Sequence, residues 1–399
     1  MNLMLKLTSL LAGITLTLAL GTSRAADISI TETRDDLGFF KPIPITINGF
    51  SGEALSVLRN DLTFMGFKFV STDEARYLVN GSAGERVEGR VVEKLTGKDR
   101  LGDPARPGGK AYTGGSTRTQ IHAFADDIAK TLTGLPGIAL SKITFKVEPG
   151  RGRSEVYISD FDGFNPTAVT RDGSLVSAPC WVGRGKLLYG SYKLGNSHIF
   201  SHVLGTGERA AVARHPGDNY SPAVSRDGRR VAMILNKNGS PSLYVANIDG
   251  SGLKQLTSTR QGDSSPSWSP DNETICFVSR SSGVAALYTI AASGGTPKPL
   301  RTAGAPNPTE PDWSPDGKWI AFTSLSGGFQ IYIVKAGGGD VVGPLAQGED
   351  PTWSPNSRAL MISTGPDHRK TLSLLDAPTK TVKPLARILE SNSQPSWAK

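Results

Sequence analysis

A Pro-x-Trp signature recurs through the C-terminal two thirds of the chain, five times intact and once with valine in place of tryptophan. The six copies begin at Pro179, Pro222, Pro266, Pro311, Pro351 and Pro395. Successive prolines are 43, 44, 45, 40 and 44 residues apart, which is the length of one propeller blade of four strands. No single unit has enough apolar residues to fold alone, so the repeat predicts units that stack on one another.

Each unit reads as four short strands, and the fourth unit shows the pattern best. Its motif strand ends in a Pro-Asp-Gly turn at residues 315–317, where proline presets φ and glycine supplies a positive φ. Three further strand segments follow, at residues 318–324, 329–335 and 341–346. Ile320 and Phe322 alternate with other residues, as do Ile331 and Ile333, and this period of two predicts half-buried strands.

The two ends of the repeat array complement each other. Residues 143–147 and 155–159 resemble the second and third strands of a unit that lacks its motif strand, whereas residues 394–399 form a motif strand with nothing after it. Joining them gives one complete blade and leaves no open sheet edge. The fold class is therefore mostly β: a six-bladed propeller over residues 139–399, closed by the C-terminal strand.

The N-terminus has the features of a secretory signal peptide. Lys6 precedes an apolar run at residues 7–20, and Ser23-Arg24-Ala25 is a small-x-small cleavage site. We expect residues 1–25 to be removed before Ala26. The apolar run is too short to span a bilayer, although a retained anchor or a buried helix is the alternative. The sequence thus predicts export.

Residues 26–138 lack the repeat and predict a small α/β domain. Helical spacing of apolar residues marks 51–62, which begins at Ser51 as a candidate N-cap, and 119–132. Strands are expected at 43–47, 67–70 and 86–93, with a long hairpin or loop at 97–115.

Charge and cysteine content exclude some classes of protein. Without residues 1–25 the formal charge is +6, from 42 basic and 36 acidic residues, and the basic residues form no run or nucleic-acid motif. We expect no nucleic-acid partner. Cys180 and Cys276 lie in non-adjacent units, too far apart for a disulfide, so both are predicted to be buried, unpaired thiols.

No cluster of catalytic or metal-binding residues is recognisable. The five histidines are His122, His198, His202, His215 and His368. His198 and His202 fall in one predicted strand, where their spacing corresponds to about 13 Å. His122 and Asp126 are one helical turn apart, which predicts a weak surface pair. We expect no catalytic residues, no metal and no cofactor.

Asp160, Asp162 and Gly163 have some likeness to a calcium loop but lack its run of oxygen ligands and terminal glutamate. A hairpin turn is the better interpretation. The five motif tryptophans occupy the same place in each unit, which favours blade-to-blade packing over a sugar-stacking surface.

Polar residues precede several motif prolines, and propeller loops converge around the central channel. The candidate binding rim consists of Asp218, Asn219, Asp263, Ser264, Ser265, Thr309, Glu310, Glu349 and Asp350. The alternative is that they are ordinary turn residues that hydrogen-bond their own backbone.

Three stretches carry a resemblance to a known family. Residues 122–137 followed by Ile143-Thr144-Phe145, residues 159–166 and the blade motif at 265–271 are similar to the TolB family, the exported six-bladed propellers of the Tol-Pal envelope system. The resemblance covers residues 117–399 well and residues 27–116 loosely.

This resemblance implies a non-enzymatic adaptor in the periplasm, a monomer that reaches the outer membrane peripherally through the lipoprotein Pal. In the family the propeller rim binds Pal, which here corresponds to the candidate rim above. The start of the mature chain docks TolA in the family, which implies a contact segment at residues 26–34. Its core is Asp27, Ile28, Ser29, Ile30, Thr31 and Glu32. The resemblance implies a role in outer-membrane integrity and in constriction at cell division.

Two alternatives stay open. One is an extracytoplasmic propeller enzyme, either a lyase or a peptidase-associated protein, and the scattered histidines argue against it. The other is a TolB-like paralogue with a different protein partner.

Overall fold

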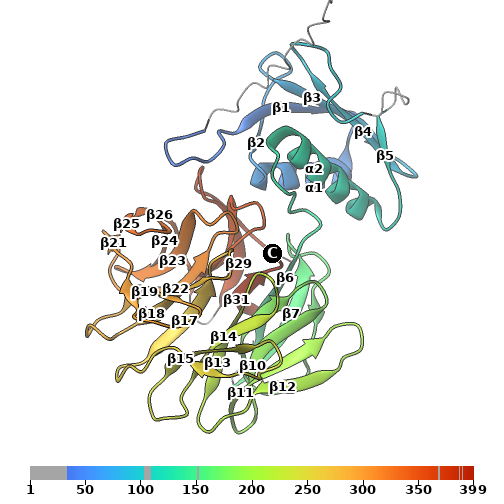
Figure 1. The fold of residues 1–399 in the computed structure, drawn as a ribbon. Coiled ribbons are helices and arrows are strands. Elements are labelled where there is room, and N and C mark those ends of the chain that lie inside the picture. Colours follow the sequence, from blue (N-terminus) through green and yellow to red (C-terminus); the bar gives the residue numbers. More distant parts are fainter. Residues whose placement is uncertain (1–33, 103–108, 151, 367–368, 386, 389) are drawn as a thin grey trace, which may run out of the picture.

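The computed structural model describes residues 34–102, 109–150, 152–366, 369–385, 387–388 and 390–399. A small α/β domain lies beside a ring of six four-stranded sheets (Figure 1). Neither helix in the described part of the chain is long and apolar enough to cross a membrane. The expected signal peptide and the segment at 27–32 lie outside the described residues.

The N-terminal domain is a five-stranded sheet covered by two helices. Its elements are β1 (Ile43–Asn48), α1 (Gly52–Phe64), β2 (Phe67–Phe69), β3 (Tyr77–Ala83), β4 (Val87–Glu93), β5 (Lys110–Tyr112) and α2 (Thr117–Thr133). The strand order is β2-β1-β3-β4-β5, and both helices lie between the sheet and the propeller (Figure 1). The sequence predicted β1, β2, β4 and both helices, but not β3 or β5.

Local chemistry explains where α2 begins and ends. The Ser116 hydroxyl accepts a hydrogen bond from the Thr119 amide at 3.2 Å, which satisfies one of the free N–H groups of the first turn. Gly134 ends the helix with φ of 71°, a left-handed conformation that glycine adopts without strain. At α1, Ser51 does hold the N-cap position, but its side chain makes no capping bond.

Six blades form the ring, each listed from its innermost strand outward. Blade 1 is β9 (Val176–Val182), β10 (Lys186–Leu194), β11 (Asn196–Val203) and β12 (Arg209–Ala213). Blade 2 is β13 (Asn219–Val224), β14 (Arg230–Leu235), β15 (Ser242–Asn247) and β16 (Lys254–Gln255). Blade 3 is β17 (Asp263–Trp268), β18 (Thr274–Ser279), β19 (Ala286–Ala291) and β20 (Lys298–Pro299).

The other three blades follow the same plan. Blade 4 is β22 (Pro308–Trp313), β23 (Trp319–Leu325), β24 (Phe329–Lys335) and β26 (Val342–Gln347). Blade 5 is β27 (Glu349–Trp353), β28 (Ala359–Thr364), β29 (Thr371–Asp376) and β30 (Thr381–Pro384). Blade 6 is β31 (Ser391–Trp397), β6 (Lys142–Gly150), β7 (Arg153–Asp160) and β8 (Thr167–Ala168). The short β21 (Thr302–Ala303) and β25 (Gly339–Asp340) pair separately.

Blade 6 confirms the predicted closure, because its innermost strand comes from the C-terminus. In β31, Trp397 pairs with Ile143 and Ser391 pairs with Glu148 of β6. This antiparallel pairing joins the two ends of the array, so the ring has no unpaired inner edge.

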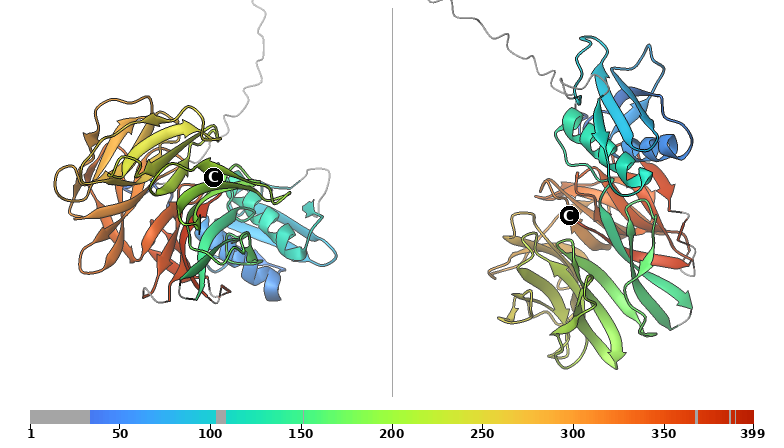
Figure 2. Two further views of the ribbon diagram at one scale, coloured as in Figure 1. Left: turned by 90° about the horizontal axis from the view of Figure 1, so that it is seen from below. Right: turned by 90° about the vertical axis from the view of Figure 1, so that its right-hand side faces the viewer.

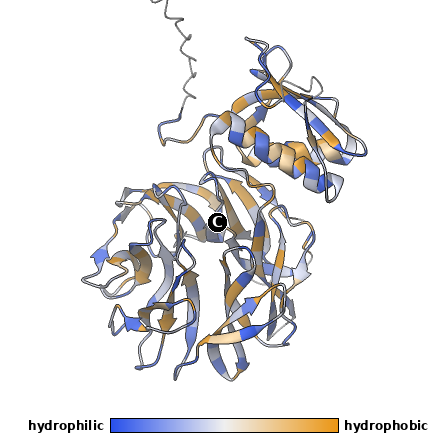
Figure 3. Cartoon of the chain, turned by 45° about the vertical axis from the view of Figure 1, so that its right-hand side comes forward, coloured by the Kyte–Doolittle hydropathy of each residue, from blue (hydrophilic) through white to orange (hydrophobic). Residues whose placement is uncertain are grey.

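Hydrophobic clusters fill the spaces between successive blades, and Figure 3 shows hydrophobic stretches along the blade strands. Ile320 and Phe322 of β23 alternate in sequence, yet residues of both parities along β23 are buried. The prediction of half-buried strands is therefore wrong for the middle of a blade, since each blade is covered by a neighbour on both faces. The cluster between blades 5 and 6 also includes the core of the N-terminal domain, so the two domains share one core.

The propeller has two distinct ends. At the hairpin face, the inner strands start and the second strand turns into the third; Val176, for example, pairs with Ser191 near the β10–β11 hairpin. At the turn face, the inner strands end, and those of blades 2 to 5 pass into the second strand through turns of the type at residues 315–317. The N-terminal domain packs on the turn-face side (Figure 2), where the Phe39 and Trp319 rings stack 5.8 Å apart.

Candidate functional site: the central channel

The residue before each motif proline has a left-handed backbone. These six residues are Ala178, Ser221, Ser265, Glu310, Asp350 and Gln394, with φ between 45° and 53°. Every inner strand also shows an irregularity in its pairing at this point. Because proline cannot donate to the ladder, a bulge is where a strand accommodates it.

On one half of the channel, the side chains of these residues link neighbouring blades. Glu310 accepts a hydrogen bond from the Asp350 amide at 2.9 Å, and Asp350 accepts one from the Gln394 amide at 3.0 Å. The Gln394 side chain in turn accepts one from the Ala178 amide at 2.9 Å. We call Glu310, Asp350 and Gln394 the tethering residues. The corresponding residues on the other half, Ala178, Ser221 and Ser265, are too short to repeat this link.

The two tethering carboxyls have shifted proton affinities. Burial raises the pKa of Glu310 and of Asp350. Repulsion by Glu310 and Glu349 adds to burial at Asp350, although hydrogen bonds from the Gln394 amide and the Ser363 hydroxyl oppose the shift, and its pKa rises to about 7.

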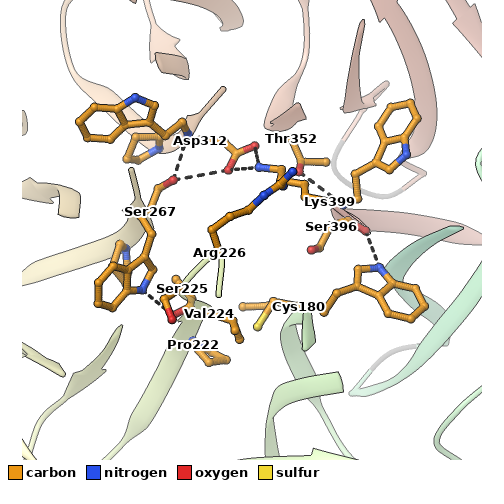
Figure 4. A pocket seen from close by; sticks show the side chains of 18 of the residues that line it. Cys180, Pro222, Val224, Ser225, Arg226, Ser267, Asp312, Thr352, Ser396 and Lys399 are labelled. Carbon is orange, nitrogen blue, oxygen red and sulfur yellow. Dashed lines mark hydrogen bonds and ion pairs between the residues drawn. The ribbon is translucent and has the colours of Figure 1, made fainter. Parts of the chain in front are cut away.

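The middle residue of the Pro-x-Trp motif makes a second set of links. The Ser267 hydroxyl accepts a hydrogen bond from the Trp313 amide at 3.0 Å, and the Asp312 carboxylate accepts one from the Trp353 amide at 2.7 Å. The Lys399 ammonium also pairs with Asp312, at 2.5 and 2.7 Å (Figure 4). The Ser267 and Asp312 links to tryptophan amides each run from one blade to the backbone of the next.

The motif tryptophans pack between blades, as the sequence predicted. Trp268 donates its indole N–H to the Ala223 carbonyl of the preceding blade at 2.9 Å, and Trp181 donates to Ser396 at 3.1 Å. Trp268 belongs to the cluster between blades 2 and 3. The motif tryptophans therefore stabilise the packing of one blade on the next.

The inner strands enclose a cavity of about 410 Å³. All six motif prolines line it, together with small polar residues and the turn residues of blade 2. Arg226 extends from blade 2 into this cavity, towards Asp312 and Lys399 (Figure 4). Cys180 also lines it. This thiol is unpaired, as predicted, but only half-buried, whereas Cys276 is fully buried.

The structure places the candidate rim residues in strands, not in loops. Only Asp218 precedes its strand; the other eight begin β13, β17, β22 and β27. Ser265, Glu310 and Asp350 line the cavity. The expectation of surface loops is wrong because the turn-type residues before each proline pair with the second strand of the blade.

Two rim residues are buried and engaged with their own loops. Asn219 donates to the carbonyls of Ser197, His215 and Gly217 at 2.9–3.1 Å, and Asp263 accepts from the Thr259 hydroxyl at 3.0 Å. Both are at most 3% exposed. They fix the position at which an inner strand starts.

Apolar residues on the hairpin face were not recognised from the sequence. Of the nine large apolar side chains exposed in the described residues, six lie there: Leu175, Tyr192, Leu194, Val284, Leu325 and Phe329. One sequence feature could have indicated this face: apolar residues flank the predicted hairpin glycines, as Leu325 and Phe329 do around Gly327 and Gly328.

The prediction for His122 is also wrong. His122 is buried and its Nδ1 lies 2.6 Å from an Asp61 carboxylate oxygen of α1. Asp126 instead accepts the amides of Ala139 and Leu140 at 2.7 and 3.1 Å. The helix turns this face towards the propeller, where the His122 ring contacts Phe161 edge-on. His122 is therefore part of the interdomain core.

No group of three or more histidine, cysteine, aspartate or glutamate side chains in the described part of the chain could hold a metal ion. Residues 160–163 form a turn, as predicted, in which the Gly163 amide donates to the Asp160 carbonyl at 2.9 Å.

A closed six-bladed ring with a packed N-terminal α/β domain places this chain in the class of six-bladed β-propeller proteins. A family model described as the TolB beta propeller domain matches residues 129–399. The chain belongs to this family.

Individual relatives agree with the family assignment. The chain is 27% identical over 284 residues to the Tol-Pal system protein TolB of Bordetella parapertussis, and the match covers 63% of each protein. It is 28% identical over 228 residues to the protein of the same name from Bordetella pertussis, covering 55% of this chain and 51% of that protein. The chain thus spans less than two thirds of these relatives' length.

A solved structure matches the fold. The crystal structure of TolB from Acinetobacter baumannii superposes with a TM-score of 0.78, covering 92% of this chain and 98% of that one, at 21% identity. At this identity the match shows the fold: an N-terminal α/β domain followed by a six-bladed propeller.

Proposed function

We propose that the chain is a periplasmic protein-binding adaptor of the Tol-Pal cell-envelope system, which links Pal to TolA and thereby supports outer-membrane integrity and constriction at division. The family assignment supports membership of this system, and the predicted signal peptide at residues 1–25 supports export. In the channel, the carboxyls of Glu310 and Asp350 accept hydrogen bonds from the next blade and so hold the ring together. This structural role is consistent with a scaffold that binds a partner.

One observation carries the choice of binding surface. Six of nine exposed large apolar side chains lie on the hairpin face, at the hairpin ends of blades 1, 3 and 4, and this bias of exposed apolar groups towards one face favours it as the protein interaction surface. Tyr192 and Phe329 are the two aromatic members, a residue type enriched at interface centres. The hairpin face also surrounds the mouth at which the candidate rim residues begin the inner strands.

The charges around this face indicate the partner's chemistry. Basic residues occupy the hairpins between second and third strands, among them Lys193, Lys237 and Arg280. A partner that presents apolar side chains bordered by acidic ones would match this face, and such complementarity speeds association. We therefore assign the Pal-binding surface to the hairpin face, with Thr309 and Glu349 at its inner border.

A pull-down tests the adaptor function. The mature protein, residues 26–399, should capture Pal from the same cell at micromolar concentration. Absence of binding would contradict the proposal. Binding that weakens as salt rises would support the charge complementarity, because exposed charges are screened.

A deletion tests the TolA segment separately. We propose that residues 26–34 contact TolA, so their removal should abolish TolA binding and leave Pal binding intact. Loss of both interactions would overturn the assignment, since it would mean that the segment supports the whole propeller and not one partner.

A further inference from the structure

Blade 2 departs from the repeat at the turn face. In blades 3, 4 and 5 the residue after the motif's Trp-Ser pair is Pro270, Pro315 or Pro355, whereas blade 2 has Val224-Ser225-Arg226. The turn itself is unchanged: Ser225 donates to Asp227 at 2.6 Å, as Ser314 donates to Asp316 at 2.7 Å. The substitution therefore alters what faces the channel without altering the fold of the turn.

Arg226 brings a guanidinium into the cavity (Figure 4). The side chain is exposed and makes no hydrogen bond or ion pair with another described residue. Asp312 is the opposite charge that acts on it, but Asp312 is already engaged by Lys399 and by the Trp353 amide. A guanidinium in this position offers a planar pair of donors that matches a carboxylate.

Hydroxyl groups accompany this cation. Ser221, Ser265 and Ser396 line the same cavity, and none of their hydroxyls bonds to another described residue. Six prolines supply the apolar walls. A cavity of about 410 Å³ with both polar and apolar walls falls in the size range of small-molecule sites.

The remaining charges limit the ligand. Glu310 and Asp350 also line the cavity, and when ionised their carboxylates repel a dianion such as phosphate more strongly than a monoanion. Burial raises the pKa of both, which favours their protonated forms and makes them partners for ligand hydroxyls.

We infer that the cavity is a binding site for a small hydroxylated monocarboxylate, whose carboxylate pairs with Arg226 and whose hydroxyls bond to Ser221, Ser265 and Ser396. This site lies at the turn-face end of the channel, away from the proposed Pal surface. It does not depend on the proposed adaptor function.

Calorimetric titration of the mature protein with D-gluconate tests the inference. Saturable binding with a dissociation constant below about 10 mM is expected. Sorbitol keeps the five hydroxyls of gluconate but has a hydroxymethyl group in place of the carboxylate, so it should bind at least about tenfold more weakly because a hydrogen bond to a charged group is lost. Absence of saturable gluconate binding would overturn the site, and phosphate binding as tight as gluconate would overturn the ligand class.

The substitution Arg226→Pro restores the residue that blades 3, 4 and 5 use, so it should fold with an unchanged melting temperature. Gluconate affinity should fall about tenfold to a hundredfold. Arg229→Gln removes the same charge from the same turn outside the cavity and should bind as the wild type does. Equal affinity in Arg226→Pro and wild type would contradict the inference.

Discussion

The two halves of the channel have the same backbone but different side chains. Blades 4, 5 and 6 carry Glu310, Asp350 and Gln394 before the motif proline, and each of these side chains accepts an amide of the next blade. Blades 1, 2 and 3 carry Ala178, Ser221 and Ser265 in the same left-handed conformation. The left-handed backbone before the motif proline is therefore common to all six blades, whereas the side-chain links between blades occur on one half only.

This difference separates scaffold from site. The tethered half includes the closing blade and packs against the N-terminal domain, with which blades 5 and 6 share a core. The untethered half leaves small side chains and free hydroxyls facing the cavity, and blade 2 adds Arg226 there. The links on one half hold the ring closed, while the other half supplies Arg226 and two of the three free hydroxyls of the proposed ligand site, which Ser396 of blade 6 completes.

The largest effect should come from a feature common to both halves. Trp397→Ala removes a buried ring that stacks on Phe161 and donates to Ser141 at 2.6 Å, and Trp268→Ala removes the equivalent ring on the untethered half. Each should lower the free energy of unfolding by about 3–5 kcal/mol. Urea unfolding measures both. A loss below about 1 kcal/mol in either variant would show that its tryptophan is not a packing residue.

The second prediction separates the halves. Asp350→Ala leaves the Gln394 amide without its acceptor, which should cost about 1–3 kcal/mol. The matched change on the other half, Ser265→Ala, removes an unengaged hydroxyl and should stay within about 0.5 kcal/mol of the wild type. If the two variants are equally stable in urea, the tethers do not hold the blades.

A smaller effect concerns pH. The pKa of Asp350 is raised to about 7 in the folded protein, so its contribution to stability is fully present below the unfolded pKa of about 4 and is lost as the pH rises through 7. Asp350→Asn keeps an acceptor oxygen but cannot ionise. Between pH 5 and pH 8 it should lose less stability than the wild type does.

Thermal unfolding at several pH values tests this sign. Ser265→Ala is the control and should follow the wild-type curve. A parallel curve for Asp350→Asn would mean that this carboxyl does not titrate in that range.

The blade architecture could be predicted because the repeat encodes it locally. Each motif proline coincides with a bulge, each tryptophan with a space between blades, and Gln394–Trp397 with the missing strand of the blade that begins at Lys142. The tethers could not be predicted, because Glu310 and the Asp350 amide meet only once the ring has closed.

The errors have a common physical cause. Asn219 and Asp263 are turn-type residues, yet strand pairing with the rest of the blade buries them. His122 was assigned to a neighbour on its own helix, whereas its partner Asp61 is 61 residues away. In both cases tertiary contacts override local propensity, and the sequence carries no local signal for them.

Isothermal titration of Pal into the mature protein and two charge variants tests the central claim, that the hairpin face is the partner-binding surface. Phe329→Asp places a charge among the exposed apolar side chains of that face, and Arg229→Glu changes the charge of the turn face. The account predicts binding by the wild type, affinity at least about tenfold weaker in Phe329→Asp, and wild-type affinity in Arg229→Glu. Unimpaired binding by Phe329→Asp, or an equal loss in Arg229→Glu, would contradict it.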